Sequence, residues 1–142
     1  MTTSPVKIRA LLLILSTIVF LTSCGVKVKE KSAHYLMEKV YQARKSRNFR
    51  QEFSLYAKKD FKIVPFEDIE YSLRAVVSGA GRFKSAKHLS TNISRRNQLG
   101  EGLVKYMVLS YEATYAHVTI NESYYFLGES ETPKIVYMTL QF

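Results

Sequence analysis

The sequence predicts an α+β domain in which N-terminal helices pack on an antiparallel sheet of about four strands. Two observations predict this class. Apolar residues recur at helical spacing between residues 32 and 82, whereas the segments after Arg82 alternate or are rich in β-branched and aromatic residues. Such segregation is typical of α+β layer folds. With 142 residues, 46% of them hydrophobic, one domain with a modest core is expected.

Two helices are expected between residues 32 and 64. Ser32 is the expected N-cap of the first, because a serine oxygen can accept a hydrogen bond from the first turn. Asn48 interrupts the first apolar stripe and is expected to cap the second helix. The stripes that predict these helices are Leu36, Val40 and Ala43, then Phe49, Phe53 and Tyr56.

A third helix is expected from Pro65, since proline favours a helix start. Acidic residues in its first turns suit the positive end of the helix dipole. Gly79 or Gly81 is expected to end it, and the sequence leaves that choice open. Its apolar stripe is Ile69, Leu73, Val76 and Val77.

Strands are expected after residue 82. Residues 89–93 alternate, 99–102 form a turn, and 103–115 form a strand with two partly apolar faces. That strand should therefore be central or covered on both sides. A turn is expected near residues 116–118, followed by a strand over 119–127. A loop over 128–134 then leads to a last strand over 135–142. The two faces of the long strand are Val104, Tyr106 and Val108, and Met107, Leu109 and Tyr111.

Residues 1–23 have the layout of a signal peptide. Lys7 and Arg9 precede an apolar run over residues 10–21, and no acidic residue occurs before Glu30. The alternative is a permanent membrane-spanning helix. The uncharged run over residues 10–26 would cover about 26 Å as a helix, short of the ~30 Å hydrocarbon core. A signal is therefore favoured.

The only cysteine ends this run. Leu21, Thr22, Ser23 and Cys24 resemble a bacterial lipobox of the signal peptidase II type: an aliphatic residue, two small residues and a cysteine. The resemblance implies cleavage before Cys24, which carries lipid on its sulfur and acyl groups such as palmitate. Buried methylenes then hold the protein on a membrane. The alternative is an ordinary signal with a chance cysteine.

The lipobox also implies a cellular location. Residues 24–31 are expected to be the lipidated cysteine and a polar tether, with the domain over 32–142 in the extracytoplasmic cell envelope or periplasm. An aspartate after the cysteine resembles an inner-membrane retention signal, and this chain has Gly25. The outer membrane is therefore favoured if the host has one.

The order of elements resembles a known superfamily. Helices followed by long strands, and the stretches "VLSYEATY", "INESYYFLGES" and "PKIVYMTL", are similar to the cystatin-like superfamily, which includes nuclear transport factor and ketosteroid isomerase. Small bacterial lipoproteins with domains of unknown function share this fold. The resemblance implies a cone-shaped domain with a curved sheet. Pro133 stands where these domains often have an aromatic residue.

No catalytic or metal-binding set is evident. His34, His88 and His117 share no metal-ligand spacing, so no metal and no cofactor are expected. Isomerase-like chemistry needs a carboxylate base and hydroxyl donors in an apolar pocket. The candidates for that alternative are Asp60 or Glu112 with Tyr56, Tyr106 and Tyr111.

Positive charge gathers near the tether. The chain has a net charge of +9, and residues 24–62 hold eleven Lys or Arg against four acidic residues. A basic face could contact anionic head groups, lipopolysaccharide phosphates, cell-wall polymer or an acidic protein. A solvated helix face is the alternative, and export argues against nucleic acid. The candidate face is Lys39, Arg44, Lys45, Arg47, Arg50, Lys58 and Lys59.

These inferences favour a small, non-enzymatic, lipid-anchored envelope lipoprotein that binds a protein partner or an envelope component. The alternative is a small-ligand-binding or isomerase-like enzyme on the same cone fold. The oligomeric state is left open.

Overall fold

The computed structural model describes residues 29–98, 100–127 and 132–142. The predicted signal peptide, the lipobox and residues 24–28 of the tether lie outside these residues. The chain is helical from residue 29 to residue 45, and we call this segment the first helix. It is followed by α2 (Phe49–Ser54), a short 3₁₀ helix (Lys58–Asp60) and α3 (Phe66–Ala80), then by β1 (Phe83–Gln98), β2 (Gly102–Tyr115), β3 (Thr119–Leu127) and β4 (Ile135–Gln141).

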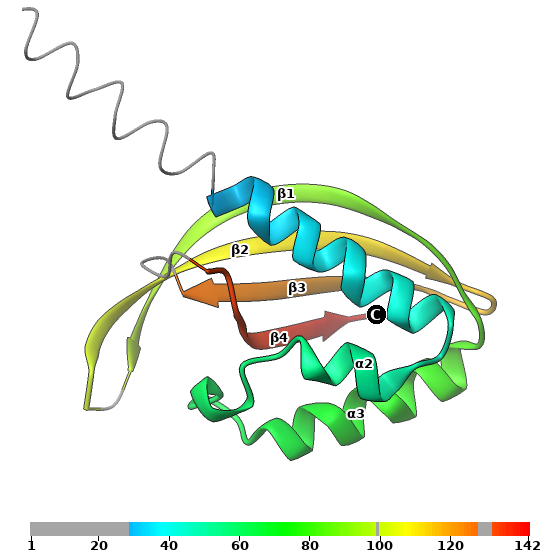
Figure 1. Ribbon diagram of the computed structural model, residues 1–142, viewed down its shortest axis with the longest axis horizontal. Helices are drawn as coiled ribbons and strands as arrows, with labels where there is room; N and C mark the ends of the chain where they lie inside the picture. The colour runs from blue at the N-terminus through cyan, green and yellow to red at the C-terminus, as the bar shows by residue number, and fades with distance from the viewer. Residues whose placement is uncertain (1–28, 99, 128–131) are drawn as a thin grey trace, which may run out of the picture.

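The four strands form one antiparallel sheet in the order β1-β2-β3-β4. The first helix crosses one face of the sheet, and α2 and α3 lie toward the β4 side (Figure 1). Helices followed by an antiparallel sheet confirm the predicted α+β class. In the described part of the chain, none of the helices has the length and apolarity needed to span a membrane.

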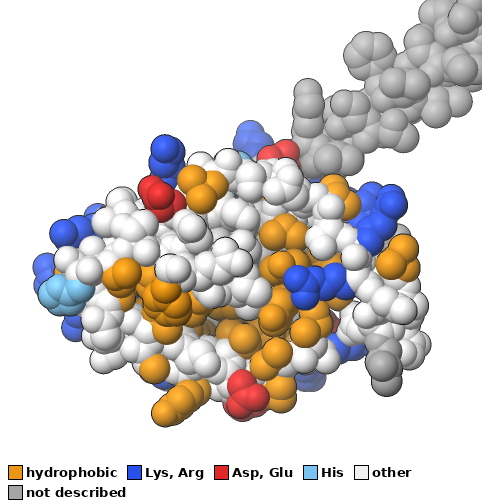
Figure 2. Space-filling model, turned by 180° about the vertical axis from the view of Figure 1, so that it is seen from behind, with side chains coloured by type: hydrophobic (Ala, Val, Ile, Leu, Met, Phe, Trp, Pro, Cys, Tyr) orange, Lys and Arg blue, Asp and Glu red, His pale blue; other side chains and the backbone are white. Residues whose placement is uncertain are grey.

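Both faces of β2 are covered, as its sequence predicts. Met107, Leu109 and Tyr111 pack in the main core with the helices. Tyr106 and Val108 belong to a second cluster on the opposite face, where hydrophobic side chains gather around cationic ones (Figure 2). Because β2 lies between β1 and β3, its side chains meet neighbours on both faces.

The helix ends follow the sequence with one exception. Asn48 caps α2, since its side-chain oxygen accepts a hydrogen bond from Gln51 N at 3.1 Å. Ser32 is not an N-cap, because residues 29–31 are already helical. Lysine and glutamate are good helix formers, so the helix includes residues 29–31, which were predicted to belong to the tether. Of the two candidate glycines, Gly81 ends α3, with φ at 83°.

The strand boundaries agree with the predicted turns. Tyr115 N donates to Val118 O at 2.9 Å, which closes the turn expected near residues 116–118. Gly100 in the turn between β1 and β2 and Gly102 at the start of β2 both adopt positive φ. Leu99 of that turn and residues 128–131 of the predicted loop lie outside the described residues. β4 pairs with β3 despite Pro133.

Candidate functional site

A buried arginine lies at the centre of the domain. Arg44 of the first helix is 1% exposed, and Glu52 of α2 and Glu122 of β3 are 0% exposed. Arg44 Nη1 donates to both carboxylate oxygens of Glu122 at 2.7 Å. Its Nε donates to Glu52 at 3.2 and 3.3 Å, and its Nη2 also binds Glu52. One cation therefore joins two carboxylates from separate elements.

Tyrosine hydroxyls complete this cluster. Glu122 accepts three of them at 2.6 to 3.0 Å, and Glu52 accepts a fourth at 3.4 Å. Every buried side-chain polar atom of the described residues has a hydrogen-bond partner. We call these seven residues the buried charge network: Arg44, Glu52, Glu122, Tyr41, Tyr56, Tyr115 and Tyr124.

The network corrects the prediction for Arg44. This residue was expected on the exposed basic face, and that expectation is wrong because Arg44 follows Val40 by four positions on the buried stripe of the helix. The two glutamates were not predicted. A signal for Glu122 exists, since Ile120, Glu122 and Tyr124 alternate on the core face of β3. A carboxylate in such a position requires a buried partner.

The network controls the ionisation of its members. Burial by itself would raise the pKa of Glu122, but the charge of Arg44 and hydrogen bonds from Tyr124, Tyr115 and Arg44 outweigh it. The pKa of Glu122 is therefore lowered from its ordinary value of 4.5. Burial would lower the pKa of Arg44, yet the two glutamates and the tyrosines raise it instead. Burial also raises the pKa of Tyr41 and Tyr124.

The lowered pKa of Glu122 predicts acid sensitivity. Its stabilisation is fully present above the unfolded value and is lost as the pH falls through the lower folded value. We expect the free energy of unfolding to decrease as the pH falls below 4.5. The free energy of unfolding of Glu122→Gln should decrease less steeply over the same range, because glutamine does not titrate. Urea unfolding at several pH values measures both slopes. If the free energy of unfolding of the two proteins changed equally with pH, the lowered pKa of Glu122 would be contradicted.

The residues predicted for isomerase-like chemistry do not converge. Asp60 lies half-buried in the 3₁₀ helix, and Glu112 lies on the face of β2 away from the main core, opposite Asn121 of β3. The three candidate tyrosines separate as well. Tyr56 belongs to the buried charge network, Tyr106 donates to Gln98, and Tyr111 contacts His34.

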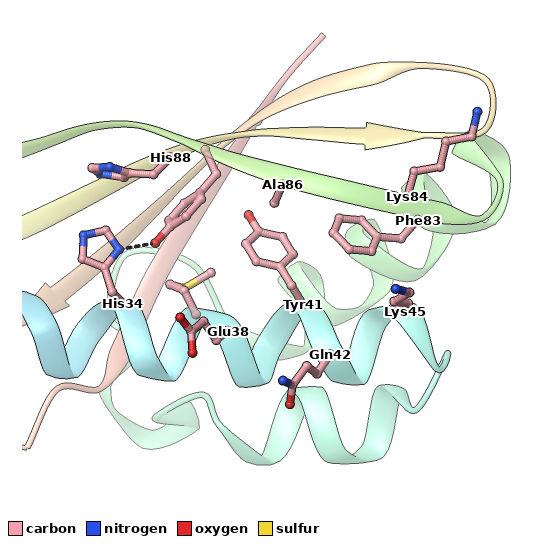
Figure 3. A pocket seen from close by; sticks show the side chains of 11 residues that line it. His34, Glu38, Tyr41, Gln42, Lys45, Phe83, Lys84, Ala86 and His88 are labelled. Atoms are coloured by element: carbon pink, nitrogen blue, oxygen red, sulfur yellow. Dashed lines mark hydrogen bonds between the residues drawn. The ribbon is translucent and has the colours of Figure 1, made fainter.

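An open groove lies between the first helix and the edge strand β1. It has a volume of about 440 Å³, and side chains from both elements line it (Figure 3). At one end, His34 Nδ1 and the Tyr111 hydroxyl are 2.8 Å apart, and the rings of His34 and His88 meet edge to face at 4.5 Å. This contact between histidines was not predicted. Within the described ranges, no three His, Cys, Asp or Glu residues gather as a metal site would require.

The predicted basic face is divided. Lys45 and Arg47 line a cleft of about 320 Å³ together with Arg82 and Phe83. Lys58 and Lys59 line a different cleft near Lys134, with a volume of about 420 Å³. The 3₁₀ helix and the end of the first helix lie on opposite sides of the helical layer (Figure 1). Lys39 and Arg50 are exposed. The sequence did not identify Arg82, because proximity to Arg47 arises only on folding.

Comparison of the chain with protein-family models, curated proteins and solved structures finds no match. Leu21, Thr22, Ser23 and Cys24 lie outside the described residues, so the lipobox remains a prediction from sequence.

Proposed function

We propose that this chain is a small lipid-anchored lipoprotein of the cell envelope, non-enzymatic, whose cystatin-like domain binds an acidic protein or an anionic envelope component. In this proposal, residues 1–23 are a signal peptide and Cys24 carries the lipid. One contrast supports the binding role. The carboxylates of the interior are bound to Arg44, whereas cations of the helical layer are exposed and available to a partner.

The two buried carboxylates of the described residues are already engaged, which favours a structural role for them over isomerase-like chemistry. A general base must be a carboxylate or imidazole within hydrogen-bond reach of a substrate proton. Glu52 and Glu122 are fully buried, and both bind the guanidinium of Arg44. Tyrosine hydroxyls occupy further acceptor positions on both. A substrate would have to displace these groups, so the network supports a structural role.

The exposed cations favour an anionic partner. Among the described residues, Lys45, Arg47 and Arg82 form no ion pair, and all three line one cleft. Unpaired charges of one sign attract an oppositely charged surface over several ångströms and raise the rate of association. The partner lies outside the cytoplasm if the lipobox functions, which argues against nucleic acid.

The tether keeps the beginning of the first helix near a bilayer, whereas the cleft of Lys45, Arg47 and Arg82 lies at the other end of that helix. The folded domain includes residue 29, and the chain from Cys24 to residue 29 can span at most about 18 Å. A lipid on Cys24 would therefore keep the helical layer close to membrane-associated partners.

The lipid anchor has a direct test. Cells that express the full chain should incorporate a radiolabelled fatty acid into the mature protein, and Cys24→Ser should abolish the label because the acceptor sulfur is absent. The variant should also keep its signal peptide, because cleavage before Cys24 follows lipidation of that residue, and the apolar run over residues 10–21 should then hold the precursor in the membrane. Unchanged labelling, or normal removal of the signal peptide in Cys24→Ser, would contradict the anchor.

Charge reversal tests the partner surface. Arg47→Glu with Arg82→Glu, both in the cationic cleft, should reduce recovery of the partner from native envelopes by about tenfold, because the substitutions turn attraction into repulsion. The matched control is Lys87→Glu with Arg95→Glu, which changes the net charge equally on β1. Recovery after crosslinking, at two salt concentrations, provides the readout. Equal recovery by the two double variants would reject this surface.

A further inference from the structure

We infer that the groove between the first helix and β1 binds a small organic anion, with a carboxylate or phosphate group on a compact aromatic body. The inference rests on the shape and charge of the groove. It requires neither the lipid on Cys24 nor a macromolecular partner.

The size and lining of the groove suit a small molecule. Its volume of about 440 Å³ falls in the range of ligand pockets, about 300–1,000 Å³. Tyr41 and Phe83 stack with ring centroids 5.2 Å apart and an interplanar angle of 7°. Ala86 lies on β1 above them (Figure 3). Both rings are buried and form the floor of the groove, so a flat apolar body would lie over this floor in the space that the small Ala86 side chain leaves open.

One end of the groove is cationic. Lys45 from the first helix and Lys84 from β1 line the groove at the Phe83 end, and the long side chain of Lys84 extends away from the helix (Figure 3). Neither lysine forms an ion pair with a described residue. The adjoining cleft shares Lys45 and Phe83 with the groove and adds Arg47 and Arg82. Since Glu38 is the one acidic residue that lines the groove, this end attracts an anion.

The other end limits the length of the ligand. His34 and His88 meet across the groove, from the helix and from β1 (Figure 3). The Tyr111 hydroxyl contacts His34 Nδ1 at 2.8 Å, and Thr91 Oγ1 lies 3.1 Å from His88 Nε2. These contacts hold both rings in place. The groove therefore favours a compact ligand over an extended polymer.

The buried charge network keeps the floor of the groove in position. The Tyr41 hydroxyl donates to Glu122 at 3.0 Å, and the Arg44 guanidinium lies 5.3 Å from the centre of the Tyr41 ring. A floor that is ordered before binding reduces the entropy cost of binding. Through the hydrogen bond of Tyr41 to Glu122, the buried charge network therefore contributes to the order of the groove as well as to the stability of the fold.

The test uses the protein from residue 24 to residue 142, labelled with ¹⁵N, and two probes, benzoate and phenyl phosphate. We expect saturable shifts of the amide signals of groove residues, with dissociation constants at or below about 1 mM. Uncharged benzamide should bind at least about fivefold more weakly, since it cannot use the cationic end. The readout does not depend on acylation of Cys24, so failure of the proposed anchor or partner leaves its outcome unchanged.

Two variants and a matched control localise the site. Ala86→Phe should abolish the shifts by filling the groove, and Lys84→Glu should weaken binding of both probes at least about fivefold. Lys87→Glu makes the same charge change three residues along β1, outside the groove, and should leave binding within about twofold. The inference is overturned if no saturable shift appears at about 10 mM probe, if benzamide binds equally well, or if Lys84→Glu and Lys87→Glu behave alike.

Discussion

Arg44→Met is expected to lower the free energy of unfolding by about 3–5 kcal/mol, a large part of the stability of a small domain. The substitution preserves much of the side-chain volume but leaves Glu52 and Glu122 buried without a counter-charge. Uncompensated buried carboxylates cost far more than a lost surface contact. Urea unfolding followed by circular dichroism measures the loss.

The adjacent position provides the control. Lys45 is exposed, so Lys45→Met should change the free energy of unfolding by less than about 0.5 kcal/mol. Similar losses of unfolding free energy for Arg44→Met and Lys45→Met would contradict the claim that the buried charge network stabilises the domain.

The pH dependence distinguishes a charge effect from a packing effect. Without Arg44, burial should raise the pKa of Glu122 in the folded state, because desolvation then acts without the opposing charge. A raised folded value means that protonation favours folding, so Arg44→Met should gain stability as the pH falls from neutral toward about 5. The wild-type protein should not gain stability in this way, because its Glu122 has a lowered pKa. A variant that only created a cavity would show no such gain.

Gly81→Ala is the second large effect, with an expected loss of about 2–4 kcal/mol. Gly81 has φ 83° and ψ −160°, a region that residues with a side chain almost never adopt. A Cβ atom there would lie 2.8 Å from His117 Cδ2 and 2.9 Å from Ala116 Cβ. His117 N also donates to Ala80 O at 3.0 Å, so the turn between β2 and β3 is held against the end of α3.

Gly79→Ala is the matched control for this position. Gly79 lies inside α3, and nothing would come within 4 Å of its Cβ. Alanine should therefore stabilise the helix by about 0.5–1 kcal/mol. Thermal unfolding of the two variants should shift in opposite directions. A loss at both positions, or at neither, would contradict the assignment of Gly81 as the residue that ends the helix.

Local rules account for the parts of the fold that were predicted correctly. Asn48 and Pro65 mark helix starts because their effects act within one turn. Alternating apolar residues identified both faces of β2, since side chains of a strand point to opposite sides whatever their partners are. Ser32 was predicted wrongly because the residues before it are good helix formers, and Glu30 lies 3.7 Å from His34 one turn further along the helix.

The candidate sites were harder to predict because they join residues far apart in the sequence. Arg44 was interpreted as a surface cation, since arginine is rarely buried without partners. Its partner Glu122 is 78 residues away, and no local pattern connects them. Likewise His34 and His88, or Arg47 and Arg82, become neighbours only when the first helix packs beside β1.

The amino-acid sequence by itself determined the α+β class and the positions of most helix and strand ends, and it predicts a lipid anchor at Cys24. These features depend on periodicity, turn residues and a short motif, all of which act over a few residues. Tertiary structure alone decided that Arg44 is buried between two glutamates, that Gly81 rather than Gly79 is constrained by a neighbouring turn, and that a cationic groove lies beside β1. Such features depend on which surfaces meet, and the free energy of a charge depends on the groups that surround it after folding.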